Sequence, residues 1–300
     1  MLIANPIYDV VFKKLMEDPE IARGVLERIL NTQVEQLEFA SQEFTTATDD
    51  GRLTFFRLDF KARICTTDGW KDVLIELQKA RLASDVDRFR SYLASEYRTV
   101  SEVPYPDGGI RRFGLPIITV YFFGYTIDPR LPGAFKIDRR YVDIITGEEL
   151  SARCDVMERL THDAYAVQIP KLGNQQRNEV EELLSVFRQD RPADEYGHTL
   201  VIDEDSPHSL LLKRIIRTLT RLIEKPEVQR AMSLEDEMFE TLAREIEEKT
   251  REYQQERDEA NRERDNAERE RDNAKRERDE AQTEIERLKL LLREHGIVGQ

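Results

Sequence analysis

Lys71–Ala80 reads KDVLIELQKA, and this stretch decides how the central part of the chain folds. Its apolar run Val73–Ile75, followed by Leu77, is typical of a buried strand. Glu76 and Gln78 nevertheless stand within the same stretch. Because burying a carboxylate without a partner costs free energy, these two side chains either face water or are held inside the protein for a purpose.

A predicted hairpin accounts for this alternation. Asp68-Gly69 stands between two β-rich runs and predicts a two-residue turn there, which places Asp59 opposite Gln78 and Lys61 opposite Glu76. Side chains alternate between the two faces of a strand, and opposite residues share a face. We therefore expect a polar face of Asp59, Lys61, Glu76 and Gln78, and an apolar face of Phe60, Ala62, Ile64, Val73, Ile75 and Leu77.

The polar face has two interpretations. In the first, it faces water, and Lys61 and Glu76 form a cross-strand ion pair. In the second, the carboxylates of Asp59 and Glu76 converge on one Mg²⁺, which prefers oxygen ligands and keeps several waters. Gln78 would then position a water or a phosphate oxygen, and Lys61 would supply positive charge. A bound divalent ion lowers the pKa of a water and neutralises charge on a phosphate under attack.

The rest of the body alternates between helical and β-rich patterns. Helices are expected at 7–18, at 19–31 with Asp18 as N-cap, and at 83–100, and a helical tract begins near Asn174. Strands are expected at 36–47, 53–66 and 116–125, with further strands near Tyr141 and Tyr165. The run at 116–125, PIITVYFFGY, is apolar enough for a central strand that is buried on both faces. The pattern predicts an α/β or mixed α+β fold.

The C-terminal part of the chain is a charged heptad repeat. Residues 256–283 read ERDEANR, ERDNAER, ERDNAKR and ERDEAQT. In the heptad that fits them best, Ala260, Ala267, Ala274 and Ala281 occupy position d, and Arg257, Arg264, Arg271 and Arg278 occupy position a. Such a seam is weak, but Phe239, Ile246, Ile285, Leu288 and Leu292 continue it with apolar residues at both ends. The repeat is therefore either a solvated single helix or a coiled coil that joins copies of the chain through residues 239–295.

Charge and composition narrow the function classes. Residues from Ser233 onward carry 22 acidic and 14 basic side chains, a net −8, and the preceding residues carry 38 and 32, a net −6. This acidity argues against binding of nucleic acid, but it does not exclude a basic groove on part of the surface. Two cysteines, Cys65 and Cys154, give no disulfide framework, which suits a reducing cytosol. We expect no signal peptide, no membrane span and a cytoplasmic location.

Several catalytic motifs are missing from the sequence. The four histidines are scattered without a zinc-binding spacing, and the chain holds no P-loop, G-x-G-x-x-G or G-x-S-x-G motif. No cofactor beyond a divalent ion, Mg²⁺ or Mn²⁺, is implied.

A family resemblance joins these segments. In order along the chain, it rests on NPIYDVVFKKLM (5–16), FFRLDFKARI (55–64), DVLIELQKA (72–80), DRFRSYLASEY (87–97) and PIITVYFFGY (116–125). This ordered set resembles the PD-(D/E)XK nuclease family transposases, the recombination-promoting, YhgA-like proteins of bacteria. The similarity covers roughly residues 1–127, and charged C-terminal heptads are familiar in the same group.

The resemblance implies a restriction-endonuclease-like αβββαβ core. We expect this nuclease-like domain at 1–200, a helical connector at 201–232 and, from the heptads, a charged helix or coiled coil at 233–300. It also implies metal-dependent hydrolysis of DNA that promotes recombination. The family's metal-binding aspartate would be Asp59, and its E-x-Q variant of the (D/E)-x-K element would be Glu76 and Gln78. Leu58 replaces the motif's Pro, and Gln78 replaces its Lys and so supplies no positive charge.

Four further residues are expected to support the site. Asp9 and Lys13, four residues apart, match the family's early D..FK pattern, and Asp9 would orient the site or reach the metal through water. Arg88 and Tyr92, also four apart, would contact a phosphate or support the site. The simpler alternatives are a surface ion pair for Asp9 and Lys13, and packing at the edge of the core for Arg88 and Tyr92.

Three functions remain open at this point. The first is a Mg²⁺-dependent DNA endonuclease whose tail forms homo-oligomers, so that two sites cut two strands. The second is a catalytically degenerate nuclease scaffold that binds DNA or a protein partner. The third is a self-associating structural protein whose function lies in the heptads.

Overall fold

A computed structural model describes residues 1–40, 43–47, 53–57, 59–79, 85–104, 108–175, 177–203 and 209–294 of the chain. The chain divides into two units, Met1–Asp236 and Glu237–Gln300, and each is described by itself. The first unit is the folded body, and the second is helical. The compact body therefore extends to Asp236, beyond the boundary at 232 that the heptads suggest.

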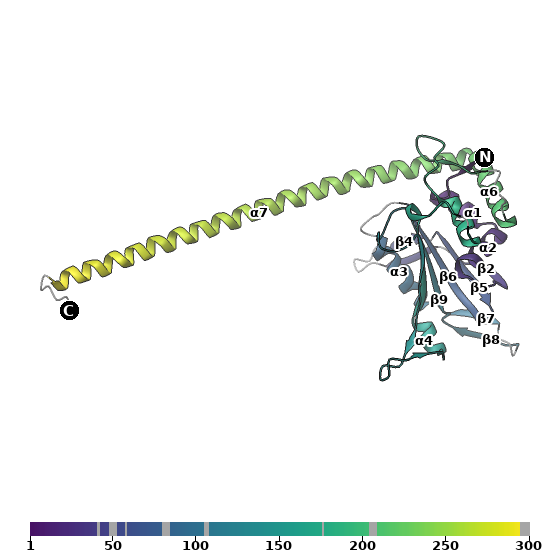
Figure 1. Cartoon of the computed structure of the whole chain (residues 1–300), viewed down its shortest axis with the longest axis horizontal. Helices are drawn as coiled ribbons and strands as arrows, with labels where there is room; N and C mark the ends of the chain where they lie inside the picture. The colour runs from purple at the N-terminus through teal and green to yellow at the C-terminus, as the bar shows by residue number, and fades with distance from the viewer. Residues whose placement is uncertain are drawn as a thin grey trace. The chain divides into compact units, whose positions relative to one another are not determined.

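A six-stranded mixed sheet forms the centre of the body (Figure 1). Its strand order is β10-β13-β9-β6-β5-β2, in which β6, β9 and β13 run parallel and the remaining neighbours pair antiparallel. The strands are β2 (Gln36–Phe39), β5 (Phe60–Thr66), β6 (Gly69–Gln78), β9 (Ile117–Phe123), β10 (Ala134–Ile137) and β13 (His162–Gln168). The mixed α+β class is confirmed, and so is the central position of the apolar run at 116–125.

The hairpin of β5 and β6 has the predicted faces but a different register. Phe60 lies opposite Ile75, and Thr66 lies opposite Gly69, so the turn is Thr67–Asp68. The predicted turn at Asp68-Gly69 was wrong because the Thr66 hydroxyl closes the loop: it accepts from Asp68 N and donates to Gly69 O, both at 3.3 Å. Gly69 has φ 103°, which glycine adopts readily. The register shift is two residues, so every side chain keeps its predicted face.

Short strand pairs accompany the central sheet. Two runs were predicted as single strands, at 36–47 and at 53–66. Each is divided between the central sheet and the β3–β4 pair. The pairs are β1 (Leu2–Ala4) with β14 (Thr199–Val201), β3 (Glu43–Ala47) with β4 (Leu53–Arg57), β7 (Ser101–Pro104) with β8 (Ile110–Phe113), and β11 (Tyr141–Val142) with β12 (Glu149–Leu150).

Helices cover both faces of the central sheet. The helical elements of the body are α1 (Asp9–Met16), α2 (Pro19–Leu30), α3 (Asp85–Arg98), α4 (Asp155–Leu160), η1 (Ile169–Lys171), α5 (Glu179–Leu184), η2 (Ser185–Phe187) and α6 (Leu210–Ile223). Figure 1 shows α1, α2 and α6 grouped together, and these three helices contact one another. As predicted, Asp18 caps α2 by accepting from Glu20 N and Ile21 N.

The two faces of the sheet bury different kinds of side chain. The apolar face, including Val73, Ile75 and Val120, packs into one large core with α1, α2 and α6. The opposite face meets α3, where Leu74 and Ile117 contact Phe89 and Tyr92. The polar residues of the hairpin share this second face. All four are buried, and Lys61 and Glu76 form ion pairs with residues of α3, so the water-exposed interpretation was wrong.

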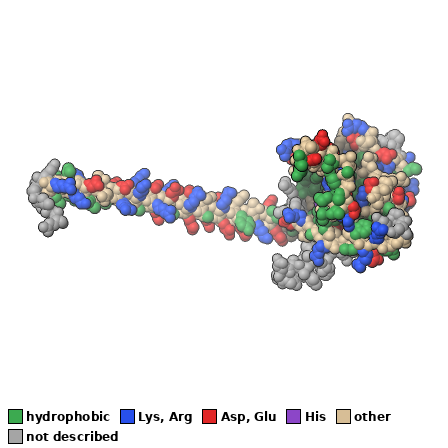
Figure 2. Space-filling view, turned by 90° about the horizontal axis from the view of Figure 1, so that it is seen from below, with side chains coloured by type: hydrophobic (Ala, Val, Ile, Leu, Met, Phe, Trp, Pro, Cys, Tyr) green, Lys and Arg blue, Asp and Glu red, His purple; other side chains and the backbone are tan. Residues whose placement is uncertain are grey.

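The long helix α7 (Pro226–Glu294) begins in the body and forms the described part of the second unit. Val228 and Met232 are buried in the body, whereas every side chain from 243 to 293 is exposed. Figure 2 shows acidic and basic side chains intermixed along this helix. None of the described helices is both long enough and apolar enough to span a membrane.

Candidate functional site

Asp59 lies in a bend directly before β5 and is 8% exposed. Its Oδ2 accepts a 2.6 Å hydrogen bond from the backbone N–H of Leu77 in β6. The carboxylate thus takes the place of a backbone acceptor where the β5–β6 ladder ends, which fixes the side chain between the two faces of the sheet. The neighbouring Leu58 lies outside the described residues.

Helix α1 brings a positive charge to Asp59. Lys13 Nζ lies 3.5 Å from Asp59 Oδ1 and 2.6 Å from Asp9 Oδ1. The expected pair of Asp9 and Lys13 is therefore present, but it is more than a surface pair, because Lys13 also reaches a buried carboxylate. The Lys13 side chain is 15% exposed and that of Asp9 is 46% exposed. Solvent consequently reaches this group of residues from the side of Asp9.

Glu76 approaches the same region from the carboxyl end of β6. It is 2% exposed, and its Oε1 accepts a 2.8 Å hydrogen bond from Arg88 Nη2 in α3. Tyr92, one turn further along α3, is 2% exposed and packs against Phe89 with ring centroids 6.1 Å apart. Arg88 therefore contacts a proposed metal ligand, whereas Tyr92 lies in the apolar cluster under α3.

The pKa of Asp59 reports how these charges are arranged. Burial raises the pKa of this carboxyl well above its usual range, and the negative charges of Glu76 and Asp9 raise it further. A hydrogen bond with Asp9 acts in the same direction, and the positive charge of Lys13 opposes them. Three carboxylates thus repel one another around a buried position, an arrangement that an additional cation would stabilise.

Gln78 and Lys61 occupy different positions around this group. Gln78 is 6% exposed, and its Oε1 accepts a 3.0 Å hydrogen bond from the hydroxyl of Tyr125. Lys61 is directed instead to Glu96 near the end of α3, with its Nζ 2.6 Å from Glu96 Oε1. The first interpretation paired Lys61 with Glu76. Instead, each forms an ion pair with a residue of α3, Lys61 with Glu96 and Glu76 with Arg88. The positive charge beside Asp59 is Lys13.

The side chains present fit a magnesium or manganese ion in their chemistry. Among the described residues, no group of three or more His, Cys, Asp or Glu side chains is arranged to hold a metal. Mg²⁺ does not require such a cage, because it is often held by one or two carboxylates and several waters. Asp59 and Glu76 supply two carboxylates from neighbouring strands, and their repulsion raises the pKa of Asp59. They are the residues that would hold the ion.

A second polar cluster adjoins the first and was not predicted. Asp236, at the start of α7, accepts hydrogen bonds from Lys79 Nζ and from the Tyr8 hydroxyl at 3.0 Å, and lies 2.8 Å from His198 Nε2. Glu235 Oε2 accepts a 3.1 Å hydrogen bond from Asp9 N at the first turn of α1. Burial raises the pKa of Glu235 to about 7. Because these residues are distant in sequence and share no motif, sequence reasoning had no signal for them.

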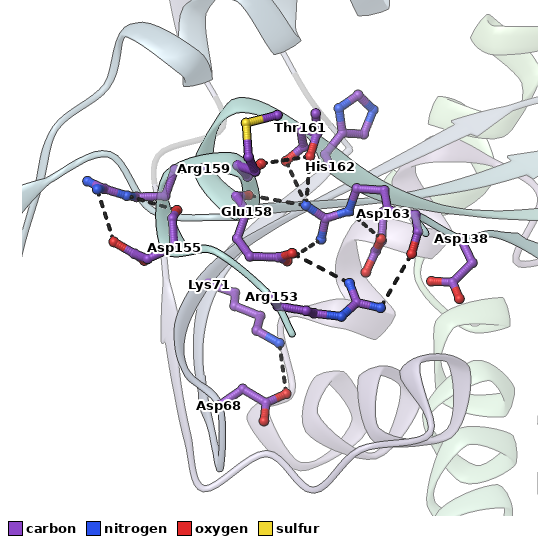
Figure 3. A network of polar contacts seen from close by, with 12 residues as sticks. Asp68, Lys71, Asp138, Arg153, Asp155, Glu158, Arg159, Thr161, His162 and Asp163 are labelled. Atoms are coloured by element: carbon purple, nitrogen blue, oxygen red, sulfur yellow. Dashed lines mark hydrogen bonds and ion pairs between the residues drawn. The ribbon is translucent and has the colours of Figure 1, made fainter. Parts of the chain in front are cut away.

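A third polar network lies at the opposite end of the sheet (Figure 3). It surrounds Arg139, whose Nε donates to Asp163 Oδ1 at 2.7 Å and whose Nη2 lies 2.8 Å from Glu158 Oε2. Arg153 also reaches Glu158, at 3.5 Å. His162 and Asp163 begin β13, whereas the candidate site lies beyond the carboxyl end of the parallel strand β6. This network therefore fastens α4 to the sheet, and it is separate from the candidate site.

Comparison of the chain with protein-family models, with curated proteins and with solved structures gave no match. The interpretation of the site therefore rests on its own geometry.

Proposed function

We propose that this chain is a metal-dependent DNA endonuclease of the PD-(D/E)XK kind. The observation that carries the proposal is the pair of buried carboxylates of Asp59, directly before β5, and Glu76 in β6, where burial and the Glu76 charge raise the pKa of Asp59. Lys13, 3.5 Å from Asp59, adds a positive charge to the same place. Two acids that could hold a divalent ion and a nearby lysine suit the hydrolysis of a phosphodiester.

The order of elements supports the same proposal. Leaving aside the two short strand pairs β3–β4 and β7–β8, the chain runs α2, β2, β5, β6, α3 and β9. The first three of these strands form an antiparallel meander, and β9 returns beside β6 in a parallel direction. This order resembles the αβββαβ order expected of a restriction-endonuclease-like core and supports the proposal, with Asp59 directly before the second of these strands and Glu76 in the third.

Each side chain has a role in this mechanism. A bound Mg²⁺ would supply an activated water and neutralise charge on the scissile phosphate. Asp59 and Glu76 would hold the ion, and Leu77 N fixes the Asp59 carboxylate in place. The Lys13 ammonium stabilises negative charge that develops on the phosphate, the task that Gln78 cannot perform. Gln78 orients a water or a phosphate oxygen through its amide, held by Tyr125.

Nicking of supercoiled plasmid in Mg²⁺ and Mn²⁺ tests the proposal. Asp59→Asn keeps an oxygen acceptor for Leu77 N but removes the charge, and it should abolish nicking while the circular dichroism spectrum stays unchanged. Lys71→Gln, at an exposed ion pair with Asp68 in the hairpin turn, is the matched control and should cut as the wild type does. Wild-type protein that cuts in neither ion, or Asp59→Asn that cuts equally well, would refute the proposal.

A second candidate function is a non-catalytic scaffold. It is favoured by the contacts that already occupy the acids, since Arg88 bonds Glu76 and Leu77 N bonds Asp59. In this case the ion pair of Glu76 and Arg88 is structural, and no metal binds. Calorimetric titration with Mn²⁺ separates the two functions: heat of binding that disappears in Asp59→Asn supports the nuclease, and its absence from the wild type supports the scaffold.

We also propose that α7 joins copies of the chain. Ile246, Ile285, Leu288 and Leu292 lie at heptad positions a and d and are 46–50% exposed. Burying such residues between helices stabilises a coiled coil. Leu288→Asp should lower the mass measured by sedimentation equilibrium. Leu290→Asp, at the outward position f and 59% exposed, should leave it unchanged. Equal masses for all three proteins would remove the tail from the assembly.

A further inference from the structure

Helix α6 presents a wholly basic surface to solvent. Its buried side chains are apolar, namely Leu212, Ile215, Ile216, Leu219 and Leu222. After Leu210, its exposed side chains are Lys213, Arg214, Arg217 and Arg221. The helix contains no acidic residue, although the whole chain has a net charge of −14. This concentration of positive charge is therefore local and runs against the charge of the whole protein.

The basic surface forms one wall of a groove against α2. The groove has a volume of about 740 Å³, and Arg23 of α2 adds a further cation to its lining. The two helices approach closely at Gly24, where an added Cβ would lie 2.7 Å from the side chain of Leu211. A side chain at Gly24 would therefore require the Leu211 side chain to move.

Most of the cations in the groove are available to a ligand. Arg214 is neutralised by Asp18 at 2.8 Å and Glu20 at 2.9 Å. Lys213, Arg217 and Arg221 form no ion pair with any residue in the described part of the chain. Their spacing of four residues places successive charges about 6 Å apart along one side of the helix.

We propose that the groove between α2 and α6 binds the phosphate backbone of duplex DNA through Lys213, Arg217 and Arg221. The inference rests on the proposed endonuclease function and adds to it a surface, outside the candidate site, that holds the substrate. Lysine and arginine make most sequence-independent contacts to phosphates and release counterions when they bind. A row of cations on a rigid helix meets that requirement without any contact to bases.

An anionic membrane is a weaker fit to this surface. Helices that lie on membranes insert an exposed apolar face between the lipids. The apolar side chains of α6 are instead buried in the core of the body, with Leu210 the exposed one. The charges of α6 therefore have no adjoining apolar surface with which to enter a bilayer.

Fluorescence anisotropy with a labelled 30-base-pair duplex tests the inference in EDTA, where no cleavage occurs. The variant replaces Lys213, Arg217 and Arg221 by Gln in the full-length chain. The matched control replaces Arg262, Arg269 and Arg276 by Gln, an equal change of charge on the exposed tail. Removal of three phosphate contacts should weaken binding at least about tenfold at 100 mM salt and reduce the slope of log K against log salt by ~1 per residue. The control should bind as the wild type does.

The outcomes separate this inference from the endonuclease proposal. Groove-dependent binding by a wild type that cuts no plasmid supports the groove and refutes the endonuclease. A groove variant that binds duplex DNA with wild-type affinity and salt slope overturns the groove, even if the protein cuts DNA. Wild-type protein that binds no DNA also overturns it. The wild type could also bind poly-glutamate or phosphatidylserine vesicles as tightly as duplex DNA, with the same loss in the groove variant. That result would assign the surface to an acidic protein or to a membrane instead.

Discussion

Glu235 is the residue from which the pH dependence of stability can be worked out most directly. Its carboxylate accepts the backbone N–H of Asp9 in a partly buried position at the start of α7. Burial is the main cause that raises its pKa from 4.5 to about 7, the charges of Asp9 and Asp236 raise it too, and Lys79 acts in the opposite direction. Replacement by Gln keeps an oxygen acceptor for Asp9 N but removes the charge.

The sign and size of the effect follow from the two pKa values. Because the pKa is higher in the folded state, the folded protein binds this proton more tightly than the unfolded chain does. The resulting stability is complete below pH 4.5 and is lost as the pH rises towards 7. At 1.36 kcal/mol for each pKa unit, and with allowance for partial exposure, the loss is ~1–3 kcal/mol.

Urea unfolding of the wild type and of Glu235→Gln at several pH values between 4.5 and 8 measures this loss. The two proteins should have similar free energies of unfolding at pH 4.5, and Glu235→Gln should be more stable by ~1–3 kcal/mol at pH 8. Glu237→Gln, an exposed acid two residues along the same helix, should show no such divergence. A difference between wild type and Glu235→Gln that stays constant with pH would refute the reasoning.

Two further predictions concern the frame around the site. Gly124→Ala should destabilise the protein by ~1–3 kcal/mol, because its Cβ would overlap the backbone oxygen of Lys79. Gly173→Ala has open space around it and should be neutral. Thermal unfolding compares the two variants, and equal melting temperatures would contradict the close approach at Gly124. Asp18→Ala should cost ~0.5–2 kcal/mol in urea unfolding through loss of the α2 N-cap. Glu20→Ala removes only an ion pair and serves as its control, so an equal cost would argue against the cap.

Local chemistry and alternation made much of the fold predictable. Asp18-Pro19 marks the start of α2 with both an N-cap and a first-turn proline, and the structure begins the helix at Pro19. Alternation in the hairpin assigned each side chain to its face, because a strand has a period of two. The register was out by two residues, since the hydroxyl of Thr66, two positions before the expected turn, closes the loop.

The two acids of the candidate site could be chosen from the sequence, but the residues that surround them could not. Asp59 and Glu76 were chosen from the hairpin and the family resemblance. The approach of Lys13 to Asp59 depends on how α1 packs against the sheet, which no local pattern encodes. The same holds for Lys61, whose pairing with Glu96 requires α3 to cover the polar face. Tertiary packing thus decides which lysine serves the buried acids.

The pairing of β1 with β14 joins two strands that are distant in the sequence. Leu2 lies opposite Val201, and the amino group of Met1 donates to Ile202 O at 3.0 Å. At a synthesis rate of ~5–20 residues per second, the ribosome would take about 10–40 s to make the partner strand after the first one. β1 is therefore made well before β14, and it stays without its partner strand until the ribosome has produced the body as far as Val201.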